Sequence, residues 1–139
     1  MIVRHLDQVL LEHFEKYKEV LVLLGARQVG KTTIIKRIFP EAQYLIVDNE
    51  PIANALERYD PAVYRQLLKP GSNWVVIDEI QKLNDPGRAA KIFFDQMPTF
   101  RLIITGSSAF NIKNKASESL AGRKIDYHLY PLSLSEYLV

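Results

Sequence analysis

One run of residues has the composition and spacing of a phosphate-binding loop. The spacing G-x-x-x-x-G-K-[ST] is formed by Gly25, Ala26, Arg27, Gln28, Val29, Gly30, Lys31 and Thr32, and Thr33 extends the predicted nucleotide-binding run. Its glycines let the backbone curl so that successive N–H groups face an anion, and a helix starting near Gly30 would point its positive end at the same place. Lys31 would neutralise the β- and γ-phosphates, and the Thr32 hydroxyl would ligate Mg²⁺. We therefore predict a nucleoside triphosphate site, in which the side chains of Arg27 and Gln28 suit solvent or domain contacts equally well.

Two acids that follow a second apolar run would complete this site. Residues 74–77 are apolar, and Asp78 and Glu79 come directly after them. An acid at the carboxyl end of a buried parallel strand lies at the ligand-binding edge of the sheet. We expect Asp78 to hold Mg²⁺ through its water shell and Glu79 to polarise the attacking water as general base. Without the loop described above, two acids turning into solvent at the end of a strand would be an equally good interpretation.

Hydroxyl side chains also follow the strand expected over residues 101–105. Thr105, Gly106, Ser107 and Ser108 stand there. If this strand lies between the loop strand and the Asp78 strand, a hydroxyl at its end would face the γ-phosphate and help to orient the water. The sequence does not separate Thr105 from Ser107 in this role, and an ordinary turn is the alternative.

The other motifs favour ATP over GTP as the nucleotide. A GTPase would carry D-x-x-G after the third strand, whereas Asp78 is followed by Glu79, Ile80 and Gln81. The nearest match to the guanine motif N-K-x-D is residues 114–117, which lack the acid. A small-molecule kinase would need no water-activating glutamate, so Glu79 favours hydrolysis. ATP with Mg²⁺ is therefore the expected pair.

These residues need a scaffold that brings separate segments together, and the hydrophobic pattern supplies it. Apolar residues recur at helical spacing between Ile2 and Tyr17, which predicts an amphipathic helix before the first strand. Short apolar runs predict strands over 20–24, 43–47, 74–77 and 101–105, and alternation predicts a half-buried edge strand over 125–129. Helices are expected over 31–39, after Asn49 and Asp60, between Asp85 and Pro98, and over 131–139, with a mobile loop at 111–119. Strands that alternate with helices indicate an α/β fold with a parallel sheet.

Size and composition limit the class of protein. The 139 residues fit one domain, and the absence of cysteine excludes disulfides and thiolate metal sites. The net charge of +2 gives no general argument for binding DNA or an anionic membrane. The longest apolar run, 20–24, is too short to span a bilayer, and the N-terminus has no signal-peptide pattern. We expect a cytoplasmic protein.

The motifs as a set resemble those of a known family. The chain resembles the ATPase domain of prokaryotic AAA-type proteins whose P-loop reads G-x-R-Q-V-G-K-T, and the matching segments are 25–33, 77–81, 104–108, 119–123 and 131–136. The resemblance implies a three-layer P-loop NTPase core with a five-stranded parallel sheet in the order 5-1-4-3-2, and it implies ATP hydrolysis. It also suggests that Arg123, before the fifth strand, stabilises the transition state at the γ-phosphate of its own or a neighbouring subunit. A surface arginine, or one paired with Glu118, is the alternative.

In this family a region of nuclease-like fold follows the ATPase domain, whereas the sequence stops at Val139. We therefore expect residues 1–139 to form one ATPase core domain truncated at its C-terminus. It would lack the helical lid that often closes over adenine in AAA-type proteins. Weak nucleotide binding and slow turnover would follow.

Two other functions stay open as alternatives. A nucleotide-dependent switch or interaction module would hold ATP tightly with negligible turnover and would move the loop at 111–119. DNA binding would use Lys113, Lys115, Arg123 and Lys124, but no groove-reading motif accompanies them, so a solvated loop fits better. A homo-oligomer or an unidentified protein partner is compatible with the sequence, and neither a nucleic acid nor a membrane is a predicted partner.

Overall fold

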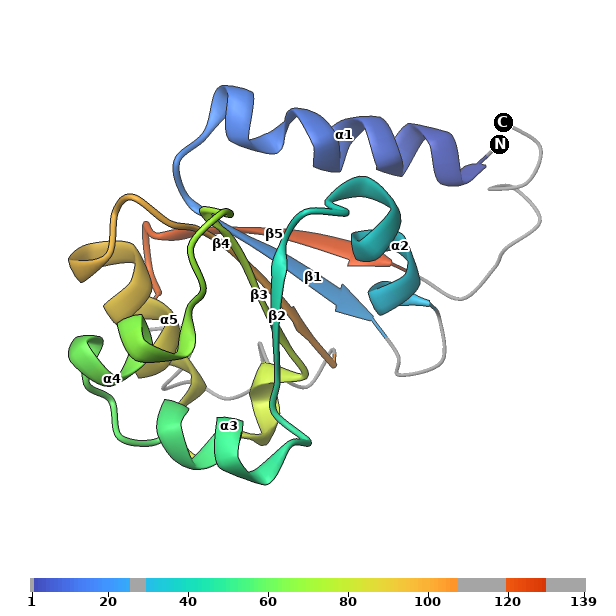
Figure 1. Ribbon diagram of the computed structural model, residues 1–139. Coiled ribbons are helices and arrows are strands. Elements are labelled where there is room, and N and C mark those ends of the chain that lie inside the picture. The colour runs from blue at the N-terminus through green and yellow to red at the C-terminus, as the bar shows by residue number, and fades with distance from the viewer. Residues whose placement is uncertain (1, 26–29, 108–119, 130–139) are drawn as a thin grey trace.

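One or two helices separate most of the successive strands, as Figure 1 shows. The computed structural model describes residues 2–25, 30–107 and 120–129, and within the first helix it describes the side chains from Gln8 onward. The helices are α1 (Ile2–Lys16), α2 (Lys31–Ile38), α3 (Glu50–Leu56), α4 (Pro61–Leu67), the short 3₁₀ helix η1 (Ile80–Lys82) and α5 (Pro86–Gln96). The strands are β1 (Val20–Gly25), β2 (Gln43–Ile46), β3 (Trp74–Asp78), β4 (Arg101–Gly106) and β5 (Lys124–Leu129). The helix expected over 131–139 and the loop expected over 111–119 lie outside the described residues.

The five strands form one parallel sheet in the order β2-β3-β4-β1-β5. This is the predicted order 5-1-4-3-2 read from the opposite edge, and that prediction is confirmed. β4 lies between β1 and β3, with Leu24 beside Gly106 and Ile77 beside Ile104. The carboxyl ends of these three strands therefore meet at the same edge of the sheet, where parallel sheets bind their ligands.

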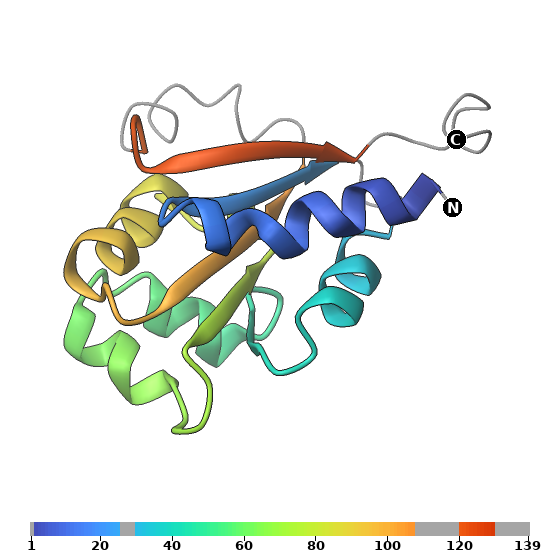
Figure 2. The same ribbon diagram turned by 90° about the horizontal axis from the view of Figure 1, so that it is seen from above.

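Helices cover both faces of the sheet, which gives the three layers expected of this fold. Figures 1 and 2 show α1 and α2 on one side and α3, α4 and α5 on the other. Side chains of β1 alternate between the two cores: Val22 packs with the α3–α5 side and Leu23 with the α1–α2 side. A strand buried on both faces has no polar side, so it reads as a continuous apolar run.

The buried imidazole of His13 fastens α1 to the sheet. It is 1% exposed, and its ring nitrogens lie 2.7 Å from the Glu19 carbonyl oxygen and 2.8 Å from the Tyr127 hydroxyl of β5. Because a carbonyl oxygen can only accept, Nε2 carries the proton and Nδ1 accepts from Tyr127. Burial lowers the pKa of His13, while the bond to Glu19 acts in the opposite direction. The neutral imidazole therefore fits this contact between α1, β1 and β5.

Side-chain caps start three of the helices where the sequence predicts them. The carboxylate or amide oxygens of Asn49, Asp60 and Asp85 accept from backbone N–H groups in the first turns of α3, α4 and α5. β5 is an edge strand, as predicted, but its burial does not alternate cleanly. Asp126 is partly buried, like its apolar neighbours on the strand. Its carboxylate accepts from the Lys124 ammonium at 2.7 Å.

Candidate nucleotide-binding site

The phosphate-binding loop lies between β1 and α2, the strand and the helix that the motif requires. Ala26, Arg27, Gln28 and Val29 lie outside the described residues, and Gly25 and Gly30 flank them. Gly30 precedes α2 with φ 85° and ψ 28°. This left-handed conformation is energetically unfavourable for a residue that has a Cβ atom. Its carbonyl accepts from the N–H of Ile34 at 3.0 Å, so the loop leads directly into the first turn of α2.

Lys31 lies inside the site, with only 3% of the residue exposed. Its ammonium donates to the Gly25 carbonyl at 2.6 Å and lies 3.7 Å from Oε1 of Glu79. A buried ammonium is stable only where such partners replace water. The positive charge is thus held between the end of β1 and the acid that follows β3.

Thr32 and Asp78 meet across the site. The Thr32 hydroxyl lies 3.2 and 3.3 Å from the two carboxylate oxygens of Asp78. Among the described residues no cluster of three His, Cys, Asp or Glu side chains could hold a metal by itself. One hydroxyl and one carboxylate nevertheless suit Mg²⁺, which prefers oxygen ligands and commonly takes few from the protein and the rest from phosphates and water. The donor set at Thr32 and Asp78 therefore fits the expected ion.

Thr105 fixes both acids at the end of β3. The residue is fully buried, and its hydroxyl donates to Oδ1 of Asp78 at 2.5 Å and accepts from the backbone N–H of Glu79 at 2.9 Å. Both bonding directions of the hydroxyl are used inside the protein. Thr105 is therefore placed to orient Asp78 and Glu79, whereas Ser107 lies just after β4 and is partly exposed.

Glu79 has an unusual backbone conformation. Its φ of 60° and ψ of 47° are left-handed, which is uncommon for a residue with a long side chain. The N–H bond to Thr105 holds this conformation, and η1 begins at the next residue. In this conformation Oε1 of Glu79 lies 3.7 Å from the Lys31 ammonium.

The sequence interpretation assigned no role to Gln81, although it stands within one of the matching segments. Its amide nitrogen donates to Oε2 of Glu79 at 2.9 Å, and its amide oxygen accepts from the backbone N–H of Ser107 at 3.3 Å. The signal that could have identified it is an amide side chain two residues beyond the candidate base. Gln81 joins the segments after β3 and β4.

The charge of Asp78 also affects Tyr44 on β2. Burial, and to a smaller extent the Asp78 carboxylate, raise the pKa of the Tyr44 phenol well above its ordinary value. Within the described part of the chain this hydroxyl is buried without a hydrogen-bond partner. Tyr44 therefore stays protonated beside the site.

Two predicted residues lie away from this cluster. Thr33 is exposed on α2. Arg123 is at the opposite edge of the sheet, where its carbonyl accepts from the N–H of Val20 and its guanidinium pairs with Asp95 of α5 at 3.0 Å. Five strand steps of about 3.3 Å separate Val20 from Gly25, or about 16 Å. Arg123 thus lies at the amino end of the sheet, and its guanidinium pairs with Asp95. Glu118, the other partner considered, lies outside the described residues.

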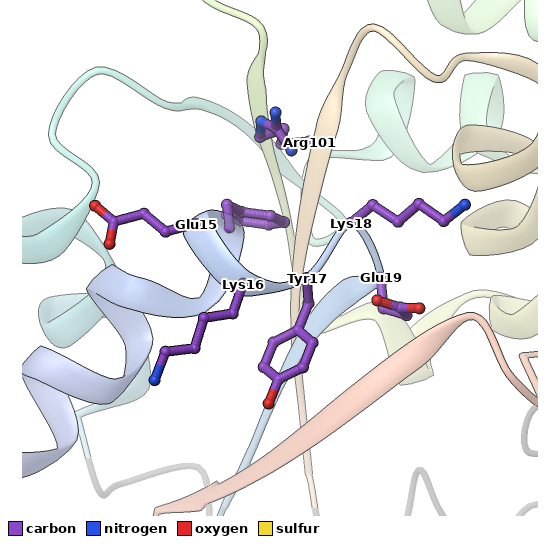
Figure 3. Close-up of a pocket in the computed structure, with 7 residues that line it drawn as sticks. Glu15, Lys16, Tyr17, Lys18, Glu19 and Arg101 are labelled. Atoms are coloured by element: carbon purple, nitrogen blue, oxygen red, sulfur yellow. The ribbon is translucent and has the colours of Figure 1, made fainter.

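A shallow open depression also lies at this opposite edge, between the end of α1 and the start of β4. Figure 3 shows its lining, which consists of Phe14, Glu15, Lys16, Tyr17, Lys18, Glu19 and Arg101. The charges are mixed in sign, and the Arg101 guanidinium lies 5.6 Å from the centre of the Phe14 ring. This depression is separate from the nucleotide site.

Among the described helices, none is both long and apolar enough to cross a membrane.

Solved structures with the same fold support this view of the architecture. The Walker-type ATPase of Pyrococcus abyssi matches with a TM-score of 0.55 and 17% identity, over 97% of this chain and 54% of that one. A DNA polymerase III gamma subunit-related protein of Thermotoga maritima matches with a TM-score of 0.56 and 10% identity, over 97% of this chain and 47% of that one. At these identities the similarity concerns the fold alone.

Curated relatives are similar in sequence but are themselves uncharacterized. A protein of Mycobacterium tuberculosis and one of Mycobacterium bovis are each 35% identical over 106 residues, which is 75% of this chain and 23% of theirs. A protein of Methanocaldococcus jannaschii is 30% identical over 149 residues, which is 94% of this chain and 31% of its own length. The chain thus spans about a quarter to a third of these relatives.

A family model places the whole nucleotide site within one domain type. The model is described as an AAA domain, and it matches residues 17–138, which include the phosphate-binding loop, both acids at the end of β3 and the segment after β4. The sheet order and the position of the loop between β1 and α2 agree with that match. The chain therefore belongs to the AAA-domain family of P-loop ATPases.

Proposed function

We propose that this domain binds ATP with Mg²⁺ and hydrolyses it to ADP and phosphate. The observation that carries the proposal is the meeting of three separate segments at one sheet edge: Lys31 and Thr32 from α2, Asp78 and Glu79 from the end of β3, and Thr105 from β4. Phosphoryl transfer to water requires these groups: a lysine, a hydroxyl, a carboxylate that can bind a metal ion and a second carboxylate.

Each side chain has a separate task in the proposed reaction. Thr32 and Asp78 would hold Mg²⁺, which supplies positive charge beside the β- and γ-phosphates. Lys31 binds the same phosphates. Glu79 accepts a proton from the attacking water while the oxygen of that water bonds to the γ-phosphorus. The bond between the γ-phosphorus and the bridging oxygen breaks, and ADP keeps that oxygen. Ser107 contacts the γ-phosphate, and Thr105 keeps both acids in place.

Binding and turnover of nucleotide test this proposal together. We expect the chain to bind ATP more tightly with Mg²⁺ than without it, to prefer ATP to GTP, and to release phosphate. Lys31→Ala should abolish binding, whereas Lys91→Ala, which removes an exposed lysine of α5, should leave it unchanged. Equal ATP affinity for these two variants would refute the assigned site. Tight ATP binding by the wild type without phosphate release would instead favour a nucleotide-dependent switch.

Arg123 supports an extension of the proposal to an oligomer. Because Arg123 lies beside Val20 at the amino end of β1, whereas its own loop follows the carboxyl end, we infer that it acts at the γ-phosphate of a neighbouring copy. The pair with Asp95 would have to open for this contact. The partner would then be a second copy of the same chain. In the wider family to which the G-x-R-Q-V-G-K-T loop points, a region of nuclease-like fold follows the ATPase domain, and we expect such a region in the longer relatives.

A further inference from the structure

Gln81 occupies a position that no part of the mechanism above uses. It is the middle residue of η1, whose neighbours Ile80 and Leu83 are buried in the core. The backbone N–H of Leu83 donates to the Ile80 carbonyl at 3.0 Å, so the turn is closed as well as buried. The Gln81 side chain therefore projects from a fixed backbone.

The two ends of this side chain contact different segments. Its NH₂ group donates to Oε2 of Glu79 at 2.9 Å, and its carbonyl oxygen accepts from the N–H of Ser107 at 3.3 Å. The amide orientation follows from the partners, because a carboxylate can only accept and a backbone N–H can only donate. Only a side chain with one donor and one acceptor can satisfy both at once.

The Glu79 carboxylate is consequently held at both of its oxygens. Oε1 lies 3.7 Å from the Lys31 ammonium, and Oε2 accepts from Gln81. The backbone of Glu79 is fixed by Thr105, as described above. Thr105 thus sets where the residue starts, and Gln81 sets the direction in which its carboxylate points.

We propose that Gln81 is a positioning residue that aligns Glu79 as general base and ties this alignment to the backbone just after β4. The proposal rests on the hydrolysis proposed above. Ser107 is the residue that the proposed function assigns to the γ-phosphate, and the Gln81 side chain links its backbone to the Glu79 carboxylate through one hydrogen bond at each end of the amide. This link adds to the bond that Thr105 makes with the backbone of Glu79. A shift of the Ser107 backbone is then transmitted to the Glu79 carboxylate through one side chain.

Two substitutions separate the two contacts. Gln81→Met removes both the donor and the acceptor at similar length, whereas Gln81→Glu keeps an acceptor for Ser107 but presents a like charge to Glu79. Gln66→Met, on the exposed surface of α4, is the matched control. Phosphate release gives kcat and KM, and amide hydrogen exchange measured by NMR follows the Ser107 N–H independently of turnover.

We expect kcat to fall roughly 10- to 100-fold in both Gln81 variants, the size of a lost hydrogen bond to a charged group, with KM unchanged. The Ser107 amide should exchange faster in Gln81→Met but not in Gln81→Glu or in the control. Adding Gln81→Met to Glu79→Gln should lower kcat no further, because residues that act as one unit are not additive.

Several outcomes would overturn the proposal. Wild-type kcat in Gln81→Glu, or unchanged Ser107 exchange in Gln81→Met, removes one of the two contacts on which it depends. A full further loss of kcat on the Glu79→Gln background would show that Gln81 acts through another group. If the wild type itself releases no phosphate, the proposed hydrolysis fails, and the role of Gln81 in it fails too. If the wild type is active and the Gln81 variants are equally active, only the assignment of Gln81 is overturned.

Discussion

Replacing Thr105 by valine tests whether this residue positions the two acids or senses the nucleotide. Valine keeps the shape of the side chain but removes a hydroxyl that donates to Asp78 and accepts from the N–H of Glu79. A buried N–H left without a partner costs about 1–3 kcal/mol, and a lost bond to a carboxylate costs about 1.5–3 kcal/mol. Asp78 keeps the Thr32 hydroxyl as a second partner, so we expect the free energy of unfolding to fall by about 2–4 kcal/mol.

The assay is urea unfolding without nucleotide, with Thr105→Ser as the control. Serine keeps the hydroxyl and loses one methyl group, which costs about 1 kcal/mol. If Thr105 only sensed a γ-phosphate, removing its hydroxyl would not matter in the protein without nucleotide. Thr105→Val and Thr105→Ser unfolding at the same urea concentration would therefore refute the assignment of both hydrogen bonds.

Three further predictions test other parts of the structure. Gly30→Ala should lower the free energy of unfolding by about 1–2 kcal/mol, because the backbone there is left-handed, and it should weaken ATP binding. Gly71→Ala, at φ 115° in a distant turn, is strained in the same way but should leave ATP binding unchanged. Equal ATP affinities of the two variants would contradict the role of Gly30 in the loop. Because burial lowers the pKa of His13, the unfolded chain binds a proton that the folded chain does not, so stability should fall as pH drops below about 6.5. Urea unfolding between pH 7.5 and 5 should show this loss in the wild type and less of it in His13→Gln, and equal slopes would exclude His13 as its source. Arg123→Ala and Lys31→Ala should each be inactive alone but regain phosphate release when mixed, and no recovery on mixing would count against action on a neighbouring copy.

Much of the scaffold could be predicted from the sequence, because strands buried on both faces leave a clear trace. The apolar run ending at Gly25 and the one ending before Asp78 both correspond to central strands. A proline one or two residues after Asn49, Asp60 and Asp85 marked the helix starts, since the caps are local interactions. The strand order, by contrast, followed from the resemblance to the AAA-type family.

The finer arrangement of the site depends on contacts between distant segments, which no local pattern reports. Thr105 and Ser107 have similar side chains, and only the bonds of Thr105 to the end of β3 separate them. η1 is too short to show a hydrophobic period, so Gln81 had no predicted position. Arg123 stands before β5 as expected, but its distance from the loop follows from the parallel register with β1.

Single-turnover phosphate release by Glu79→Gln tests the central claim most directly. Glutamine keeps the size of the side chain but cannot accept the proton of the attacking water, so ATP should still bind while the rate of release falls by about 100-fold or more. Glu41→Gln, on the exposed surface before β2, should release phosphate as the wild type does. Release by Glu79→Gln at the wild-type rate would contradict the assignment of Glu79 as the general base and, with it, the proposed mechanism.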